Sequence, residues 1–446
     1  MEHTFNFLSN VWQDLKQENN QHFSFIPFLL VLTTIILPYG VNNVSLGIFI
    51  FSVLAQFKKF QFNSNIALVL SIALFVLMVI SFLWSIDASA TLKAIPKEIA
   101  LLLIPLSFLL IKPFSKEQKS KIIQYYSFTM VIYVVYYLIK GLIRFFLSGD
   151  TNVFFYHELV TKQVNAIHVS VYVAIAFFYF FTKEIKSKID FICSFLLFLF
   201  VFLLSSKNII VIFILLILVD YFFFSKSGNK MRLRNMTVFV LVMGAFLFFG
   251  KIKNRFLAEF QSNSEKSISH TVLDLDKSLE NVHVVSIHEA WTNKNFTPND
   301  FFPGTAFRVY QARMFVELFQ RENVFWTGFG LNASYKKLEE KAIAYNVFLG
   351  NEQHDGYQTK NFHNQYIQNF AELGVFGFLI LIFMLLLNLK SAIKNKDFIQ
   401  ITFAVLMISL FLTESFLWRQ RGVVFFSLMY CLFNAKESLA PIKEKI

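Results

Sequence analysis

Residues 66–84 read IALVLSIALFVLMVISFLW, an apolar run without a single charged side chain. A helix of roughly 20 apolar residues is needed to cross a hydrocarbon core about 30 Å thick, because each helical residue adds about 1.5 Å. A run of this length predicts a membrane-spanning helix. The stretch therefore decides the class of fold, and much of the chain repeats its pattern.

The composition of the whole chain agrees with this interpretation. Of its 446 residues, 56% are hydrophobic and only 16% are charged, and 59 are phenylalanine. A soluble protein has about 25% charged residues, and a disordered chain combines low hydrophobicity with high charge, so both classes are excluded. Cys193 and Cys431 lie in apolar runs and offer neither a disulfide framework nor zinc spacing. We expect no cleavable signal peptide, because residues 1–21 are polar.

Further apolar runs bring the expected number of spans to about twelve. They lie near 24–38, 41–57, 98–111, 122–146, 165–182, 190–205, 208–224, 236–250, 367–389, 398–414 and 420–434. We therefore expect an all-α polytopic membrane protein. Its N-terminal membrane region of about nine helices covers residues 1–250, and a C-terminal membrane region of about three helices covers residues 366–446.

The basic residues predict how the spans are oriented. About half of the 41 Lys and Arg residues fall in alternate connecting segments, and such segments lie on the cytoplasmic side. Both termini are then expected in the cytoplasm. Much of the formal charge of +12 is thus an orientation signal. It does not indicate a nucleic-acid partner, which would require basic residues clustered on a polar surface.

One long segment, residues 251–365, has a composition unlike that of a membrane span. Its acids and bases balance, and the orientation argument places it on the extracytoplasmic face. Within it, Phe307–Phe319 shows the spacing of an amphipathic helix, with one side formed by Phe307, Tyr310, Met314, Phe315 and Leu318. We expect this large loop to be a small, mainly helical cap. It holds most of the nine histidines, namely His270, His283, His288, His354 and His363.

The clearest candidate site begins where this loop enters the tenth predicted span. Residues 363–377 read HNQYIQNFAELGVFG, in which a His-Asn pair is followed by Gly374 eleven residues on. Upstream, Arg308 leads a helix that ends near Gly328-Phe329-Gly330. The order and spacing of these segments resemble the O-antigen ligase and O-antigen polymerase superfamily of bacterial membrane glycosyltransferases. A third family element usually carries Ser-Arg; here the corresponding Ser205-Ser206-Lys207-Asn208 has Lys in place of Arg.

The resemblance implies a function in lipopolysaccharide biosynthesis in the cell envelope. A glycan would be transferred, with inversion, from undecaprenyl diphosphate to an acceptor hydroxyl on the periplasmic face of the inner membrane. The acceptor is the lipid A core for a ligase and another repeat unit for a polymerase. The single large outer loop favours the ligase slightly, and protein O-glycosylation is a smaller alternative. Membrane lipids are the other expected partners.

The chemistry of this reaction assigns roles to a few residues. His363 is the predicted base or acceptor-orienting group, because imidazole titrates near neutral pH. Arg308 and Lys207, with Arg313 in reserve, are predicted to bind the diphosphate through charge-assisted hydrogen bonds, although Lys lacks the bidentate fork of Arg. No metal or other cofactor is expected, since the sequence has no Asp-x-Asp pair and no His-x-x-x-His spacing. Weaker candidates are Asn364, His168 and Glu372.

Each of these assignments has a structural alternative. His363 could cap the tenth span, Arg308 could be a solvated residue at a helix start, and Lys207 lies where lysines snorkel. Gly328 and Gly330 are expected to serve a tight turn. The main rival function is a transporter of a lipid-linked glycan or a small anion. Ion-coupled carriers, however, usually keep acids or histidines in the middle of spans and often show repeated halves. This sequence has almost no such residues in mid-span and no detectable repeat, which argues against a carrier. A structural envelope protein would leave the His-Asn to Gly spacing unexplained.

Overall fold

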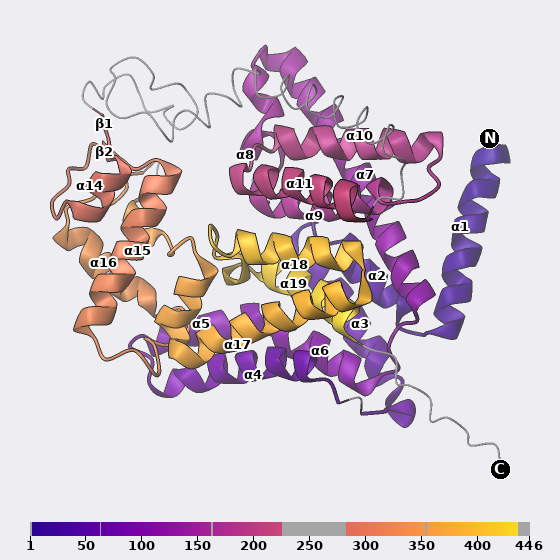
Figure 1. Ribbon diagram of the computed structural model, residues 1–446, viewed down its shortest axis with the longest axis horizontal. Helices are drawn as coiled ribbons and strands as arrows, with labels where there is room; N and C mark the ends of the chain where they lie inside the picture. Colours follow the sequence, from indigo (N-terminus) through magenta and orange to yellow (C-terminus); the bar gives the residue numbers. More distant parts are fainter. Residues whose placement is uncertain (1, 63, 162–163, 225–281, 353–354, 436–446) are drawn as a thin grey trace.

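The computed structural model describes residues 2–62, 64–161, 164–224, 282–352 and 355–435. Over these ranges the protein is almost entirely helical, as predicted (Figure 1). The strands found there are β1 (His283–Val284) and β2 (Asp300–Phe301), which pair in parallel. The predicted ninth span near 236–250, and two of the loop histidines, His270 and His354, lie outside the described residues.

The other predicted apolar runs coincide with helices. These are α2 (Phe25–Thr33), α3 (Tyr39–Leu54), α4 (Ile66–Ile80), α6 (Ala100–Leu110), α7 (Lys116–Ser148), α9 (Ala166–Phe181), α10 (Lys188–Leu203), α11 (Lys207–Val219), α17 (Gln365–Asn395), α18 (Phe398–Leu410) and α19 (Gln420–Asn434). Four segments of the described chain are long and apolar enough to cross a membrane, namely Ile66–Leu83, Lys116–Ser148, Lys207–Phe224 and Gln365–Asn395. The protein thus has several candidate spans, and the total of about twelve stays a prediction.

Polar residues just before the apolar runs set the helix starts. Asn65 precedes α4 and accepts a hydrogen bond from the Ala67 backbone N–H at 3.0 Å. Ser115 forms a capping box with Gln118 at the start of α7, and a second capping box opens α10. Such caps satisfy N–H groups that have no partner within the helix, each contributing about 1 kcal/mol. The alternation of caps and apolar runs explains why the helices could be predicted so closely.

The membrane region packs around helices that are buried on all sides. Nearly every side chain of α9 is buried, and this helix contacts α7, α10, α11 and α18. A helix that is apolar all round belongs in the interior of a bundle. Phenylalanines fill much of the space between helices; the Phe28 ring, for example, packs edge to face on Phe49 and Phe108 with centroids 5.5 Å away in both cases. Such pairs add to the stabilisation gained from burial alone.

Among the longer helices described outside residues 282–364, α1 (Glu2–Gln21) and α5 (Ala88–Glu98) have no counterpart among the predicted runs. The first is polar and lies beside α7, where Lys121 pairs with Asp14 and Glu18. The second begins at Asp87, whose side chain caps it. The shorter elements are η1 (Phe57–Lys59), η2 (Ser81–Leu83), η3 (Thr151–Phe154), α8 (Tyr156–Leu159), η4 (Asp220–Phe224), η5 (Tyr357–Thr359) and η6 (Phe416–Trp418).

Residues 282–352 and 355–364, which we call the cap, surround a second hydrophobic core, to which Ala371 of α17 also contributes. The cap contains α14 (Ile287–Thr292), α15 (Gly304–Arg321) and α16 (Ser334–Ala344), and lies at the end of the molecule opposite α1 (Figure 1). The predicted amphipathic helix is confirmed within α15, where the buried side chains include Phe307, Tyr310, Met314 and Leu318.

The cap joins the membrane region at a break in α17. Gly374 interrupts the helix with φ 66° and ψ −165°. Backbone groups on either side of the break bond to the chain that follows α15: Phe329 N–H donates to Ala371 O at 2.8 Å, and Val375 N–H donates to Phe325 O at 2.8 Å. The cap segment thus supplies main-chain partners that a continuous helix would have supplied itself.

The glycines of this junction are explained by the close approach of the two backbones. Gly328 and Gly330 have φ of 67° and 99°, which agrees with the predicted turn. The turn alone is not the whole reason, however, because a Cβ on Gly328 would lie 2.4 Å from the backbone of Glu372. A Cβ on Gly374 would lie 2.2 Å from Trp326 O. Only glycine allows both the positive φ and this approach.

Replacing Gly374 with alanine is therefore expected to destabilise the protein strongly. The backbone conformation alone should cost about 1–3 kcal/mol in an alanine, and the contact with Trp326 adds to that cost. The matched control is Gly47→Ala in α3, where a Cβ would meet nothing within 4 Å. Melting of the full-length protein in detergent measures the difference. Equal melting temperatures for the two variants would contradict this account of the junction.

Candidate functional site

His363 lies where the cap enters α17, and its backbone is held in an uncommon conformation. Its φ is 48°, in the left-handed region that costs non-glycine residues of order 1–3 kcal/mol. Its backbone N–H donates to Asn361 Oδ1 at 2.9 Å. The next residue, Asn364, caps α17 by accepting from Ile367 N–H at 3.0 Å and donates to Leu412 O at 3.1 Å. These bonds fix the position of the imidazole.

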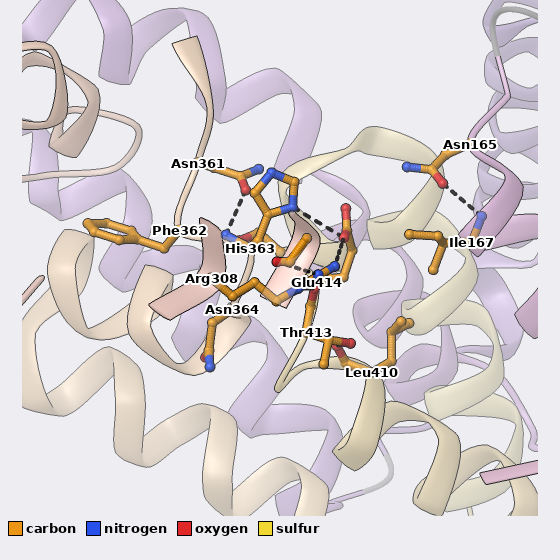
Figure 2. Close-up of polar contacts among 12 residues, drawn as sticks. Asn165, Ile167, Arg308, Asn361, Phe362, His363, Asn364, Leu410, Thr413 and Glu414 are labelled. Atoms are coloured by element: carbon orange, nitrogen blue, oxygen red, sulfur yellow. Dashed lines mark hydrogen bonds and ion pairs between the residues drawn. The ribbon is translucent and has the colours of Figure 1, made fainter. Parts of the chain in front are cut away.

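The His363 ring faces the carboxylate of Glu414, just beyond the end of α18 (Figure 2). His363 Nδ1 lies 3.4 Å from Glu414 Oε2, and Glu414 is buried. Burial raises the pKa of Glu414, but the hydrogen bond from His363 and the nearby charges of His363 and Arg308 outweigh it and hold that pKa below its usual range. An ionised carboxylate here favours a proton on Nδ1, which leaves Nε2 to accept one.

Arg308 reaches the same carboxylate from α15. Its Nη2 lies 3.9 Å from Glu414 Oε2, while Nε donates to Thr413 O at 2.7 Å and Nη1 donates to Gly304 O at 2.9 Å. Two backbone carbonyls therefore orient the guanidinium, and its side chain stays 32% exposed. A guanidinium held in this way, with part of its surface open, can bind an incoming anion without first being ordered.

The start of α11 meets the same turn. Asn208 Nδ2 donates to Thr413 Oγ1 at 2.8 Å and to Ser409 O at 2.9 Å. Lys207, the first residue of α11, is half-buried next to Asn208. The structure thus brings the predicted Lys207 element, Arg308 and His363 together around residues 409–414, although they are far apart in the sequence.

Glu414 is the site residue that the sequence interpretation missed as a candidate. Its position directly after an apolar run was the available signal, because an acid at the edge of a span is costly unless it has a partner or a function. Which partner it meets depends on the fold, since His363 and Arg308 come from other elements.

His168 lies at the buried start of α9. Its ring packs on Phe416 with centroids 4.3 Å apart, and its Nε2 is buried without a hydrogen bond in the described part of the chain. The Glu414 carboxylate is near enough to interact electrostatically with the His168 ring. His168 therefore belongs to the wall behind the His363–Glu414 contact, and its role in the reaction stays a prediction.

Glu372, another weaker candidate, lies in an internal polar cluster. Its carboxylate is buried and accepts hydrogen bonds from Gln368 Nε2 and, at 3.2 Å, from Ser334 Oγ in the cap. With Glu98 it borders a cavity of about 20 Å³, enough for roughly one water molecule. These contacts link α17 to α16, and no hydrogen bond joins Glu372 to His363 within the described residues.

Arg313 faces a different part of the cap. It is buried, its Nε lies 2.9 Å from Glu317 Oε1, and its guanidinium stacks on the Tyr345 ring at 5.2 Å. Glu317 also pairs with Lys341 and accepts a hydrogen bond from Tyr345 Oη at 2.6 Å. The structure does not bring Arg313 next to His363, and its reserve role in diphosphate binding stays a prediction.

The Glu317 cluster should make the stability of the cap depend on pH. Burial raises the pKa of Glu317, but hydrogen bonds from Lys341 and Tyr345 and the charge of Lys341 outweigh burial and lower it to about 2. Because this folded-state pKa lies below the ordinary 4.5, the stabilisation is full above about 4.5 and is lost as pH falls toward 2. Melting of the full-length protein between pH 7 and 3 should fall more steeply for wild type than for Glu317→Gln. An exposed cap glutamate, Glu352→Gln, should keep the wild-type slope, and equal slopes for all three would rule the effect out.

The arrangement around His363 is suited to acid–base chemistry on an anionic substrate. It combines an imidazole whose Nε2 makes no hydrogen bond within the described residues, a buried carboxylate that orients the ring, and an ordered guanidinium. Within the described ranges no three His, Cys, Asp or Glu side chains come together as metal ligands would. The metal-independent scheme nevertheless stays a prediction.

The comparisons with known proteins identify a family over part of the chain. A search of curated proteins gave no significant match. Residues 192–382 match the family model described as O-antigen ligase. This region contains Lys207, Arg308 and His363, the residues on which the resemblance was predicted, whereas Glu414 lies beyond it. The predicted resemblance is confirmed over residues 192–382, which match the O-antigen ligase family of membrane glycosyltransferase-like enzymes.

Proposed function

We propose that the protein transfers a glycan from undecaprenyl diphosphate to a hydroxyl of the lipid A core. The observation that carries this proposal is the contact between His363 and Glu414 beside Arg308, at the junction of the cap with α17. A base and an anion-binding group side by side are what a transfer from a diphosphate to a hydroxyl requires. The family match supports glycan transfer as the type of reaction.

The proposed reaction is a single displacement. The acceptor oxygen attacks the anomeric carbon, the bond from that carbon to the diphosphate breaks, and the hydroxyl proton passes to His363 Nε2. Undecaprenyl diphosphate leaves with the bonding electron pair, and attack from the opposite face inverts the anomeric configuration. Glu414 stabilises the imidazolium that forms. Arg308 and Lys207 bind the diphosphate and stabilise the charge that develops on it.

This function requires a definite topology, which is part of the proposal. The cap, with the rest of residues 251–365, lies on the periplasmic side of the bacterial inner membrane, and both termini are cytoplasmic. The membrane regions 1–250 and 366–446 hold the site at the outer surface. The distribution of basic residues supports this orientation. The position of His363 just before α17, a candidate span, supports a site at a membrane surface.

The test is the envelope glycan profile of a strain that lacks the protein. For a ligase, long polymer should accumulate on the lipid carrier while the lipid A core stays bare, and wild-type protein should restore the banding pattern. Single unpolymerised units on the core would instead identify a polymerase. An unchanged profile, together with transport of a solute by the reconstituted protein, would refute glycan transfer in favour of a carrier.

A further inference from the structure

A groove of about 880 Å³ opens beside the candidate site. Its walls come from the start of α5, from α16, from η5 and from η6. The lining side chains that matter here are Asp87, Tyr335, Glu339, Gln358 and Trp418. The volume falls within the range of about 300–1,000 Å³ that small-molecule sites occupy.

One wall of the groove is aromatic. The Tyr335 and Trp418 rings have centroids 5.8 Å apart and an interplanar angle of 41°. Trp418 Nε1 donates to Asn332 Oδ1 at 2.9 Å, which fixes the indole. The Lys97 ammonium lies 5.3 Å from the centre of the indole ring, and Lys97 borders the smaller inner cavity rather than the groove. The indole is therefore held on its polar edge and packed by the cation, so it forms a firm platform.

The rest of the groove is lined mainly by polar side chains. Lys336 adds an ammonium group to the carboxylates of Asp87 and Glu339, and Gln358 adds an amide. A neutral ligand with several hydroxyl groups can donate hydrogen bonds to the carboxylates and accept them from the ammonium and the amide.

The side chains that line the groove favour some classes of ligand over others. The carboxylates of Asp87 and Glu339 outnumber the single ammonium of Lys336 in the lining, so the groove has no excess of positive charge to attract a phosphate. An apolar ligand would offer no hydrogen bond to these polar side chains and would take water away from them. A sugar ring satisfies both kinds of surface, because its C–H face packs on an aromatic ring and its hydroxyls both donate and accept hydrogen bonds.

The groove adjoins the reacting groups on two sides. Trp418 lies four residues after Glu414, on the same short connection. The Tyr335 hydroxyl lies near the side chain of Asn361, which accepts the hydrogen bond from His363 N–H. A sugar bound on Trp418 and Tyr335 would therefore have its reacting end close to His363.

We propose that this groove is a saccharide subsite, which binds the sugar residues next to the bond that is made or broken. The proposal rests on the proposed function, since it assigns the groove to the glycan of that reaction. The sugar belongs either to the donor glycan or to the acceptor oligosaccharide, and the two share the chemistry that the groove recognises.

Binding to the full-length protein in lipid nanodiscs tests the proposal with two probes. One is the glycan released by mild acid from the lipid-linked donor, and the other is the oligosaccharide released from the lipid A core. Trp418→Ala should weaken binding of one probe about tenfold, because it removes the stacking surface. Glu339→Ala, at an exposed side chain, should weaken the same probe about threefold without disturbing the fold. The probe that is affected identifies the donor or the acceptor as the source of the sugar.

The matched control is Trp291→Ala, because Trp291 is a half-exposed tryptophan elsewhere in the cap. It should bind both probes as wild type does. Unchanged binding in both Trp418→Ala and Glu339→Ala, or no binding of either probe to wild type, would overturn the subsite. If the glycan profile of the deletion strain still shows a transfer defect, only the subsite fails; an unchanged profile would mean that the proposed function fails as well.

Discussion

Replacing His363 with asparagine is expected to lower the rate of glycan transfer about 10²–10⁴-fold, the usual contribution of a general base. Asparagine cannot accept the proton, yet it tolerates the left-handed backbone that residue 363 adopts at φ 48°. The loss should therefore reflect chemistry rather than misfolding. It would be measured as transfer from purified lipid-linked donor to the lipid A core by wild-type and variant protein at equal concentration.

The matched control is His288→Asn, at an exposed histidine in the same cap. It should keep the wild-type rate. A His363→Asn protein that transfers glycan within about threefold of wild type would remove His363 from the role of base.

Replacing Glu414 with glutamine is expected to have the second largest effect, a loss on the order of 10²-fold or more in kcat. Glutamine keeps the shape of the side chain but not its charge, so it no longer stabilises the imidazolium and no longer selects the proton on Nδ1. Arg308 should stay in place, because Thr413 O and Gly304 O hold it independently of the carboxylate. The KM for the donor should therefore change little.

The Glu414→Asp variant distinguishes a role of the carboxylate in orienting His363 from a role in the stability of the fold alone. Aspartate retains the charge at a longer distance and should recover part of the lost kcat, whereas a purely structural role would gain nothing from it. Glu340→Gln, at an exposed glutamate of the cap, serves as the control. A Glu414→Gln protein with wild-type kcat would show that the carboxylate does not act through His363.

The helical architecture could be predicted because the signals that determine it are local. Each apolar run is long enough to bury a helix, and a residue such as Asn65 or Ser115 marks where the helix begins. The amphipathic helix within α15 could be predicted for the same reason, because the spacing of its apolar residues is also a local signal. Helix α5 escaped prediction because it is short and polar, and its start depends on the Asp87 side chain rather than on an apolar run.

The site could be predicted only in part, because its residues are far apart in the sequence and the fold alone brings them together. His363, Arg308 and Lys207 were found through the spacing of their segments, and the structure places all three segments around residues 409–414. Glu414 had no such spacing, since its partners lie 51 and 106 positions away in the chain. Arg313 is the opposite case. It lies close to Arg308 in the sequence and was therefore predicted as a reserve diphosphate ligand, but its side chain points toward Glu317.

Because the junction at Gly374 is made by main-chain atoms, the positions of the site residues do not depend on most of the side chains of the cap. Arg308 belongs to α15 and His363 lies just before α17. The bonds between residues 325–330 and 371–375, which help to set the relative position of these two helices, involve backbone atoms alone. Under the proposed function, side chains on the outer surface of the cap and in the groove can therefore change to suit a different glycan without moving Arg308 or His363. Specificity and catalysis can evolve separately in such a molecule, provided that the glycines of the junction stay.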